Sequence, residues 1–372
     1  MNSIKILMVE DDKDQQTLYE DAVEEYSETA HISMSLTIVS NAADAISELN
    51  SVNFDAVFLD LLLEGDASSG GEASGNDVLS HIVNSSSMRP IVYILSGTLH
   101  SLSSSFNHIF ENPLMRKFSR DNKTDEVLAD LIKVLNTGVT KILGRSGKLE
   151  KLIDEIYFKH LAKGFDFWQS QGENMESALL RYTALHLVEY LDLPERDHDS
   201  TLESSYFSPE FYIYPPIKER ISTGDVIKLD DKLYVLLTPA CDISPRSIGG
   251  GIAYNVDTVT LAEIVRLDKS VFDANGIKYH ISEATDGKWR NFEKNQRESQ
   301  CKNRFHYVPN YIDIPESVID FKRLKSIAMT EYLNDSKVVR IATISSPFLR
   351  DIQSRFSSYY GRQGQPNGVW AH

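Results

Sequence analysis

Two apolar segments of this chain end in carboxylates, and this pattern constrains both its fold and its chemistry. Ile6–Val9 runs directly into Glu10–Asp12, and Ala56–Leu59 runs directly into Asp60. If these segments form neighbouring parallel strands, their acidic ends meet at one sheet edge, where the charges repel unless a cation such as Mg²⁺ binds them. A carboxylate beside Mg²⁺ can accept a phosphoryl group, because the metal neutralises the charge that develops during transfer.

Two further polar residues follow apolar segments in the same way. Pro90–Leu95 leads into Ser96, whose hydroxyl can hydrogen-bond a phosphoryl oxygen, and Leu114–Phe118 contains Lys117. A lysine at that point can form an ion pair with Asp60, or with a phosphate carried by Asp60.

With these residues in this order, the segment from Met1 to about Val139 resembles the CheY-like receiver domain of bacterial two-component response regulators. Five apolar segments alternate with amphipathic ones, as a doubly wound parallel sheet requires. The resemblance implies an α/β fold with a five-stranded, flavodoxin-like parallel sheet. In such sheets, active groups lie at the carboxyl ends of the strands.

The resemblance also implies a role for each polar residue. Asp60 would be the phosphoacceptor, and Ser96 and Lys117 would hold the phosphoryl group. A Mg²⁺ ion would be bound by Asp60, by Asp11 directly, by Glu10 through water and by the backbone carbonyl of Leu62.

An alternative interpretation of the acidic run is helix capping. Carboxylates at Glu10–Asp12 can accept hydrogen bonds from the free N–H groups of a following helix. This interpretation explains neither Asp60 nor Lys117. For Asp12 alone, the cap and the metal site are equally good hypotheses.

Three features depart from the usual receiver pattern. Phe118 stands where a proline usually follows the lysine, and Leu114 occupies the position of the usual aromatic switch residue. The segment Leu63–Gly75 after Asp60 is long and rich in Gly and Ser, a composition typical of flexible loops. It is either a gate for a kinase or phosphatase, or a surface insertion, which such loops tolerate.

Composition limits the remaining functions. The chain has 372 residues, enough for two or three domains, and a formal net charge of −16. Binding to nucleic-acid backbones depends on Lys and Arg, so nucleic acid is not an expected partner, and no helix-turn-helix with a basic recognition helix is evident. There is no apolar run of membrane-spanning length and no signal-peptide pattern, and the two cysteines are too few for a disulfide scaffold. We therefore expect a cytoplasmic protein.

After the predicted receiver domain, residues 1–139, we expect a helical connector over residues 140–200. Apolar residues at helical spacing predict helices over about 148–161 and 174–190. The pair can be a rigid connector, a dimerisation bundle or the first part of the output domain. His160 and His186 are interpreted as packing residues, because no neighbouring Cys, Asp or Glu completes a metal-ligand spacing.

Residues 201–372 form the predicted output domain, an α+β unit with a small β-barrel or half-barrel. Two apolar segments flank Asp230–Asp231 and predict a hairpin. Strand-like runs at 259–267 and 338–344, a partly helical segment at 282–302 and a closing helix at 348–360 complete the pattern.

One motif of this domain contains candidate reactive residues. Thr238–Asp242 ends an apolar segment, and Cys241 in it is a candidate nucleophile or ligand that Cys301 and His306 can join. The spacing matches no zinc template, and we favour a turn in which Pro239 fixes the bend, Cys241 packs and Asp242 caps. Arginines from 340 to 362 either bind phosphate or RNA, or form a solvated face; we favour the solvated face.

Two functions from different classes follow. In the first, the chain is a phospho-receiver signalling protein of a phosphorelay, a phosphoacceptor rather than a conventional enzyme. A sensor histidine kinase or phosphotransfer protein is its partner, a second copy is a candidate partner, and the output is not DNA binding. In the second, a receiver controls an effector enzyme of the RNase or toxin class, because the segment from Gly224 to Pro239 resembles a short part of the MazF-like toxin barrel. The rest of that domain resembles only uncharacterised bacterial domains.

Overall fold

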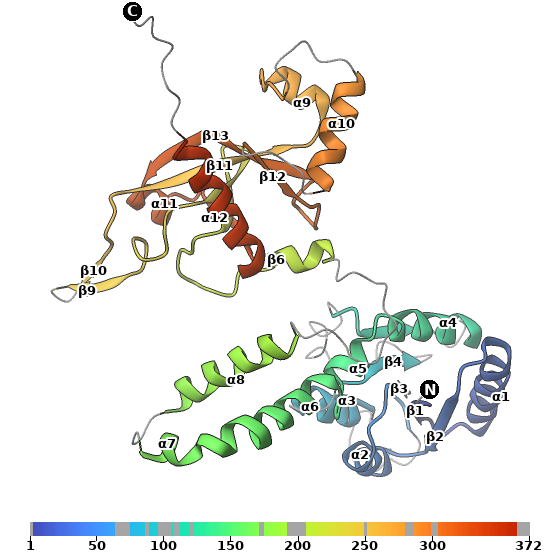
Figure 1. Cartoon of the computed structure of the whole chain (residues 1–372). Helices are drawn as coiled ribbons and strands as arrows, with labels where there is room; N and C mark the ends of the chain where they lie inside the picture. The colour runs from blue at the N-terminus through green and yellow to red at the C-terminus, as the bar shows by residue number, and fades with distance from the viewer. Residues whose placement is uncertain are drawn as a thin grey trace, which may run out of the picture. The chain divides into compact units, whose positions relative to one another are not determined.

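The computed structural model describes residues 3–63, 75–85, 89–95, 106, 112–119, 123–170, 175–191, 206–248, 251–279, 286–298 and 304–362. The chain divides into two compact units, residues 1–198 and 199–372 (Figure 1). The helices that were predicted as a connector belong to the first unit. Each unit is described by itself.

The first unit is built on a parallel sheet of five strands in the order β2-β1-β3-β4-β5. These strands are β1 (Ile4–Val9), β2 (Met34–Val39), β3 (Ala56–Leu59), β4 (Ile91–Leu95) and β5 (Met115–Phe118). The order is that of a doubly wound, flavodoxin-like sheet, in which β1 and β3 lie side by side at the reversal of strand order. The α/β fold predicted for this part of the chain is confirmed.

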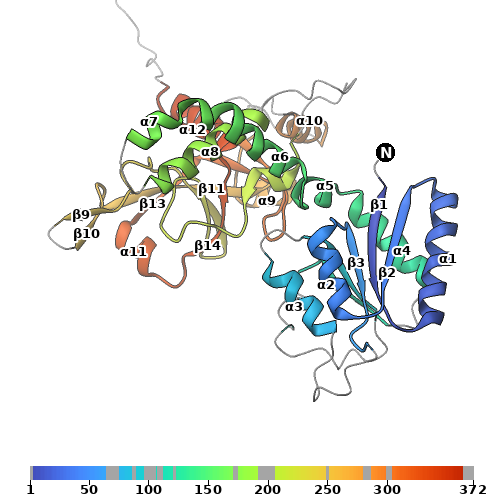
Figure 2. The ribbon, with the colours of Figure 1, turned by 90° about the horizontal axis from the view of Figure 1, so that it is seen from below.

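Helices cover both faces of this sheet, as Figure 2 shows. One face packs on α1 (Lys13–Ala30) and α4 (Thr124–Leu135), and the other packs on α2 (Ala42–Ser51) and α3 (Gly75–Asn84). Strands buried on both sides must be apolar throughout. This explains why all four residues of β3 are buried, and why its first polar residue, Asp60, marks the end of the strand.

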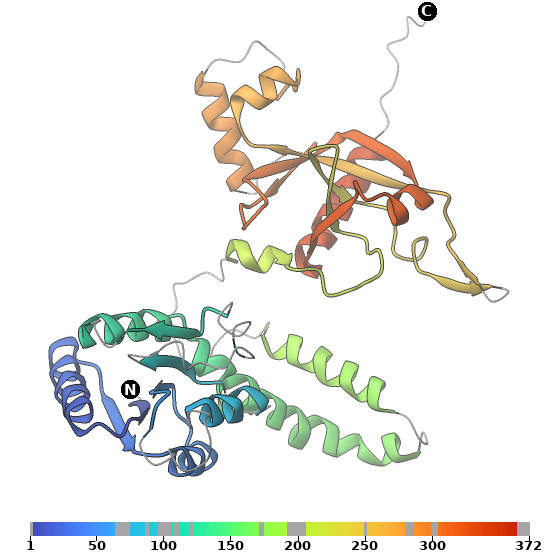
Figure 3. The same ribbon diagram turned by 180° about the vertical axis from the view of Figure 1, so that it is seen from behind.

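A helical hairpin completes the first unit. After α5 (Val139–Leu143), a nearly continuous helix runs through α6 (Lys148–Glu155), a π-helical turn (Ile156–Leu161), a short 3₁₀ turn (Ala162–Gly164) and α7 (Phe165–Ser170). The helix α8 (Glu176–Leu191) runs alongside it (Figure 3). His160 and His186 lie between the helices, with ring centroids 5.0 Å apart, and a ring nitrogen of His160 is 2.8 Å from the hydroxyl of Tyr190. The interpretation of both histidines as packing residues is confirmed.

The second unit contains a seven-stranded antiparallel sheet in the order β12-β13-β11-β8-β7-β14-β6. Its strands are β6 (Tyr212–Ile213), β7 (Asp225–Leu229), β8 (Lys232–Leu236), β11 (Thr258–Arg266), β12 (Phe305–Val308), β13 (Ser317–Ala328) and β14 (Val339–Ile344). A separate ribbon pairs β9 (Arg246–Ile248) with β10 (Gly251–Ala253). The predicted hairpin is β7–β8, and Asp230 and Asp231 both have positive φ, as a two-residue type I′ hairpin turn requires.

The seven-stranded sheet curls so that its two edges approach each other. The hydroxyl of Tyr212 in the edge strand β6 donates to the carbonyl of Pro309, directly after the other edge strand, at 2.6 Å. In the described part of the unit, no strand pairing joins β6 to β12, so hydrogen bonds between strands do not close the sheet into a barrel. The main core lies between this sheet and α12 (Ser346–Tyr360).

Smaller helices cover the rest of the sheet. The helix α11 (Met329–Asn334) packs over a second core, and α9 (Lys269–Ala274) and α10 (Asp286–Arg297) enclose an aromatic core around Phe272 and Trp289. A 3₁₀ turn, η5 (Ser208–Phe211), leads into β6. The predicted closing helix and the helix in the segment 282–302 are thus both present.

Two ion pairs of the second unit reach into its interior. Arg304 donates two hydrogen bonds, of 2.8 and 2.6 Å, to the fully buried carboxylate of Asp320. Arg340 lies 3.2 Å from the fully buried carboxylate of Asp225 and also donates to two backbone carbonyls. The solvated-face interpretation is therefore wrong for Arg340, because its charge balances a carboxylate that the sheet buries.

No helix in the described ranges is long and apolar enough to cross a membrane.

Candidate functional site in the first unit

The fold brings three of the predicted acidic residues together. β1 and β3 pair in parallel with Val9 opposite Leu59, so the next residues on each strand, Glu10 and Asp60, leave the sheet at the same edge. One carboxylate oxygen from each of Glu10, Asp11 and Asp60 lies within 4.8 Å of the others. Glu10 and Asp60 are each only 3% exposed. The sheet edge thus holds a compact cluster of carboxylates, most of it buried.

Backbone hydrogen bonds fix the position of this cluster. The N–H of Glu10 donates to Val39 at 3.0 Å, and the N–H of Asp60 donates to Val9 at 2.9 Å. The side-chain amide of Gln16 donates to the carbonyl of Glu10 at 2.6 Å. The two buried acids are therefore held by the strand ends on which they lie.

Asp12 has a different role from its neighbours. It is the N-cap of α1, and its carboxylate accepts from the N–H groups of Asp14 at 2.9 Å and Gln15 at 3.4 Å. Its own N–H donates to the carboxylate of Glu10 at 3.1 Å. Of the two hypotheses for Asp12, the structure favours the cap.

Gly75, which sequence analysis took as the end of a loop, is part of the site. It begins α3, and a Cβ atom on it would lie 2.3 Å from the carbonyl oxygen of Asp60 and 2.6 Å from the Cα of Leu61. Only glycine permits this approach. The signal in the sequence is the residue type alone, since glycine is the default residue where one backbone approaches another closely.

Lys117 lies near the end of β5 and is exposed. The register places Leu59 opposite Ile94 and Ile94 opposite Lys117, so the lysine is level with the residue before Asp60 and separated from it by β4. This position is compatible with its predicted role. Ser96 and most of the loop Leu63–Gly75 lie outside the described residues, while Leu62 is described and about half exposed. The roles of Leu62, Ser96 and Lys117 stay predictions.

The donor set fits Mg²⁺. This ion takes oxygen ligands, usually one or two carboxylates together with water, and the cluster offers three carboxylates without any nitrogen or sulfur donor. Three close negative charges in a mostly buried place also gain stability from a divalent cation, because their mutual repulsion is relieved. Glu10, Asp11 and Asp60 are the residues that would hold it.

The candidate residues of the second unit do not form one cluster. Cys241 is exposed, in a turn where the N–H of Asp242 donates to the carbonyl of Pro239 at 3.0 Å. The turn is as expected, but the expectation that Cys241 packs in it is wrong. His306 lies in β12 and lines a pocket to which Cys241 does not contribute. Cys301 lies outside the described residues.

Comparison with solved structures returns receiver domains over the first part of the chain. The BeF₃-activated receiver domain of RstA from Klebsiella pneumoniae is 20% identical, over 35% of this chain and 96% of that one, with a TM-score of 0.26. The response regulator TrrA from Thermotoga maritima, in complex with Mg²⁺-BeF, is 18% identical, over 35% and 97%, with a TM-score of 0.26. The receiver domain of a sensor histidine kinase from Pseudomonas aeruginosa, with magnesium coordinated in its active-site cleft, is 20% identical, over 36% and 97%, with a TM-score of 0.25.

No family model matches the chain, and no curated protein matches it. At identities this low, likeness to solved structures concerns the fold alone, and the strand order reported above carries the assignment of the fold. The first unit has the doubly wound, flavodoxin-like strand order that CheY shares. The second unit has no assigned relative among the findings above.

Proposed function

We propose that this protein is a phospho-receiver whose Asp60 accepts a phosphoryl group from a sensor histidine kinase or a phosphotransfer protein. The observation that carries the proposal is the convergence of Glu10, Asp11 and Asp60 at the carboxyl end of a doubly wound sheet. That is where ligands bind in open α/β sheets. Helix capping explains the position of Asp12. It does not explain why the carboxylates of Glu10 and Asp60 are buried together at the sheet edge.

In the proposed transfer, a carboxylate oxygen of Asp60 attacks the phosphorus of a phosphohistidine. The bond from phosphorus to the imidazole nitrogen breaks as the bond to oxygen forms, which leaves an acyl phosphate on Asp60. The donor ring leaves as a neutral imidazole because its other nitrogen carries a proton in the reacting phosphohistidine. Mg²⁺ bound by the cluster supplies charge neutralisation for the transferred group. Lys117 and the hydroxyl of Ser96 are proposed to bind phosphoryl oxygens, and the carbonyl of Leu62 to complete the metal ligands.

The test is labelling of the full chain with a small phosphodonor such as acetyl phosphate in the presence of Mg²⁺. We expect one phosphoryl group per chain, labile to hydroxylamine, and its loss in Asp60→Asn. Asp55→Asn is the matched control, because Asp55 stands at the other end of β3, where it accepts from the N–H of Lys5 at 3.0 Å. Unchanged labelling of Asp60→Asn, or equal loss in Asp55→Asn, would contradict the proposal.

The alternative, an RNase-like or toxin-like effector in the second unit, has weaker support. The residues considered for its chemistry are not gathered in one place: Cys241 is exposed in a turn, and Arg340 is paired with buried Asp225. A Cys241→Ala variant that retains the cellular effect of the protein would count against a thiol-dependent effector.

A further inference from the structure

One face of α8 joins this helix to the rest of the first unit. The helix runs alongside the long helix that extends from α6 to α7 (Figure 3). Three side chains of α8 that recur every four residues contact rings of the long helix. The ring centroid of Tyr182 lies 5.4 Å from that of Trp168, and those of His186 and Tyr190 lie 5.0 and 5.6 Å from that of His160. We call this side of α8 its inner face.

The opposite side of α8, its outer face, is apolar and exposed. Its central residues follow one another at intervals of four, four and three positions, which places them in one row along the helix: Leu180, Ala184, Val188 and Leu191. Residues two positions apart lie on nearly opposite sides of a helix with 3.6 residues per turn, so this row points away from the inner face. Leu185 lies beside the row. The four leucine and valine side chains of the outer face are all more than half exposed.

Such a row is an interaction surface rather than a feature of the hairpin itself. The contacts that hold α8 on the long helix come from the inner face, and the hairpin does not need an apolar outer face to form. Exposed apolar patches of this kind often mark protein–protein contacts.

Charge points to a second copy as the partner. Residues 139–191, which contain the hairpin, include seven Lys and Arg and seven Asp and Glu, whereas the whole chain has a net charge of −16. Two copies of so acidic a chain repel each other at long range, and a neutral contact surface adds nothing to that repulsion. A basic partner would instead be attracted to the acidic remainder of the chain.

The charged residues beside the row also determine a direction of packing. Arg181 and Glu189 are exposed and lie along the same edge of the outer face, eight positions apart. In an antiparallel pair of α8 helices, the start of each helix meets the end of the other, so Arg181 of each copy lies near Glu189 of the second copy. A parallel pair would bring Arg181 to Arg181 and Glu189 to Glu189, which are like charges. The outer face is therefore complementary to itself in the antiparallel direction.

We propose that the outer face of α8 is a dimer interface, on which a second copy packs its own α8 in the antiparallel direction about a two-fold axis. Leu180 then packs near Leu191 of the second copy, and Ala184 near Val188 of the second copy. The symmetry forms each contact twice, including the ion pair, as in any dimer built on one self-complementary patch. The proposal goes beyond the receiver function and does not depend on it.

This interface would also position the two parallel sheets of the dimer. The start of the hairpin is hydrogen-bonded to the sheet and its helices, since Arg89 donates to the carbonyl of Leu143 at 2.9 Å and Arg145 donates to the carbonyl of Asn50 at 3.0 Å. Two copies joined through α8 therefore carry their candidate phosphoacceptor sites on one assembly.

The experiment is sedimentation equilibrium of the full chain over a range of protein concentrations, which gives the dimer dissociation constant. Arg181→Glu places two pairs of like charges across the interface and should raise this constant about tenfold. Glu189→Arg should do the same. The double variant Arg181→Glu, Glu189→Arg exchanges the two charges and restores opposite charges across an antiparallel pair. It should return the constant to within about twofold of the unmodified value, and thermal unfolding shows that each variant is folded.

Lys133→Glu is the matched control. It makes the same change of net charge as Arg181→Glu at an exposed position of α4, outside the hairpin, and should leave the dissociation constant nearly unchanged. An unmodified chain that is monomeric at every concentration would overturn the proposal, because the face would then serve another occupant. Single charge reversals without effect, or a double variant that stays as weak as the single ones, would overturn it as well.

Discussion

Gly75 lies directly against the backbone of Asp60. A methyl group on Gly75 would lie 2.3 Å from the Asp60 carbonyl oxygen, far inside any allowed contact. The start of α3 and the proposed phosphoacceptor are thus mechanically linked, since neither backbone can move toward the other. This contact joins a residue that ends a strand to one that begins a helix 15 positions later.

We predict that Gly75→Ala destabilises the first unit by about 1–3 kcal/mol, as overpacking of a close contact does. It should also slow labelling of Asp60 by a small phosphodonor, because the added methyl group displaces α3 or the strand end. Urea unfolding and labelling rates measure the two effects. Gly164→Ala is the control: no atom lies within 4 Å of the added methyl group, so stability should be unchanged or slightly higher. Wild-type behaviour of Gly75→Ala would contradict the close contact.

The neighbours Asp11 and Asp12 should separate metal binding from helix capping. Mg²⁺ at ten times its dissociation constant should raise the free energy of unfolding by about 1.4 kcal/mol, and a chelator should reverse the gain. Asp11→Ala should abolish this gain, because Asp11 belongs to the carboxylate cluster. Asp12→Ala should cost about 1 kcal/mol through loss of the cap but keep the response to Mg²⁺. If Asp12→Ala abolishes the response to Mg²⁺ and Asp11→Ala keeps it, then Asp12 is the metal ligand.

Arg304 should be essential to the stability of the second unit. In Arg304→Ala, the fully buried carboxylate of Asp320 loses both side-chain hydrogen bonds. Breaking a buried pair in this way costs about 3–5 kcal/mol. Trp289 is buried in the second unit, so its fluorescence can follow unfolding in urea once the other two tryptophans are replaced by Trp168→Phe and Trp370→Phe. Lys294→Ala, which breaks an exposed pair of 3.6 Å with Glu298, should cost no more than about 0.5 kcal/mol. If Arg304→Ala and Lys294→Ala lower the free energy of unfolding equally, the burial of the Asp320 carboxylate is contradicted.

Acid should weaken the second unit through His306. Burial lowers its pKa in the folded state, so the unfolded chain binds the proton more readily. The stability contributed by neutral His306 is complete above the unfolded pKa of about 6.5, and it is lost as the pH falls from there through the folded value. The groups that face the ring are Asp351 and Arg355 of α12, the Tyr307 carbonyl and the ring of Phe211.

The measurement is urea unfolding, followed by Trp289 fluorescence, between pH 5 and 8. His306→Gln should lose less stability than the unmodified chain on acidification across this window. His31→Gln, at an exposed position of the first unit, serves as the control and should leave the pH dependence of the second unit as it is. If His306→Gln and the unmodified chain lose stability in parallel, His306 is not the group that responds.

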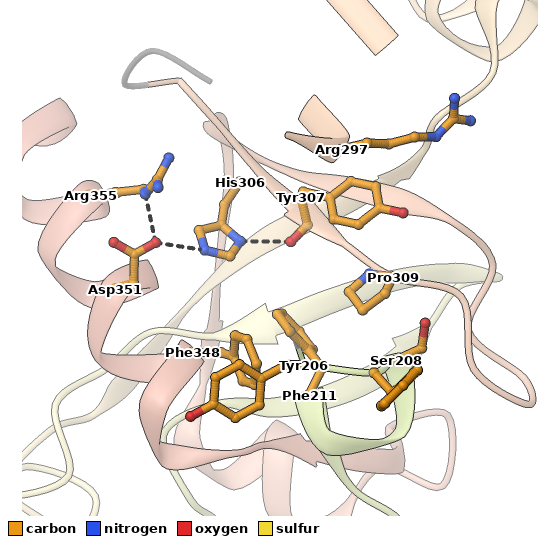
Figure 4. Close-up of a pocket in the computed structure, with 11 residues that line it drawn as sticks. Tyr206, Ser208, Phe211, Arg297, His306, Tyr307, Pro309, Phe348, Asp351 and Arg355 are labelled. Carbon is orange, nitrogen blue, oxygen red and sulfur yellow. Dashed lines mark hydrogen bonds and ion pairs between the residues drawn. The ribbon is translucent and has the colours of Figure 1, made fainter. Parts of the chain in front are cut away.

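The sequence predicts best those features that depend on neighbouring strands running in the same direction. Apolar runs that end in Glu10 and Asp60 predict both the parallel sheet and its acidic edge, because side chains at neighbouring strand ends must meet. The pocket around His306 has no such signal. Most of its residues come from η5, β12 and α12, which are far apart in the sequence and meet only in the fold (Figure 4). Likewise, nothing local to Arg340 shows that its partner Asp225, 115 residues earlier, is buried.

The hairpin of the first unit should mediate self-association. Tyr182, His186 and Tyr190 of α8 face the neighbouring helix, yet Leu180 and Leu185 on its other side are 73% and 68% exposed. Val188 and Leu191 of the same helix are also more than half exposed, and a run of exposed apolar side chains often marks an interaction surface. Two such hairpins, one from each of two copies, can pack as a four-helix bundle. We expect the full chain to form dimers by light scattering coupled to size-exclusion chromatography.

In that experiment, the double variant Leu180→Glu, Leu185→Glu should be monomeric, because association would bury four unpaired carboxylates per dimer. Leu18→Glu makes the same change at an exposed leucine of α1, outside the hairpin, and should remain dimeric. A dimer that survives the double variant would place the interface elsewhere. A monomeric unmodified chain would show instead that no second copy covers α8.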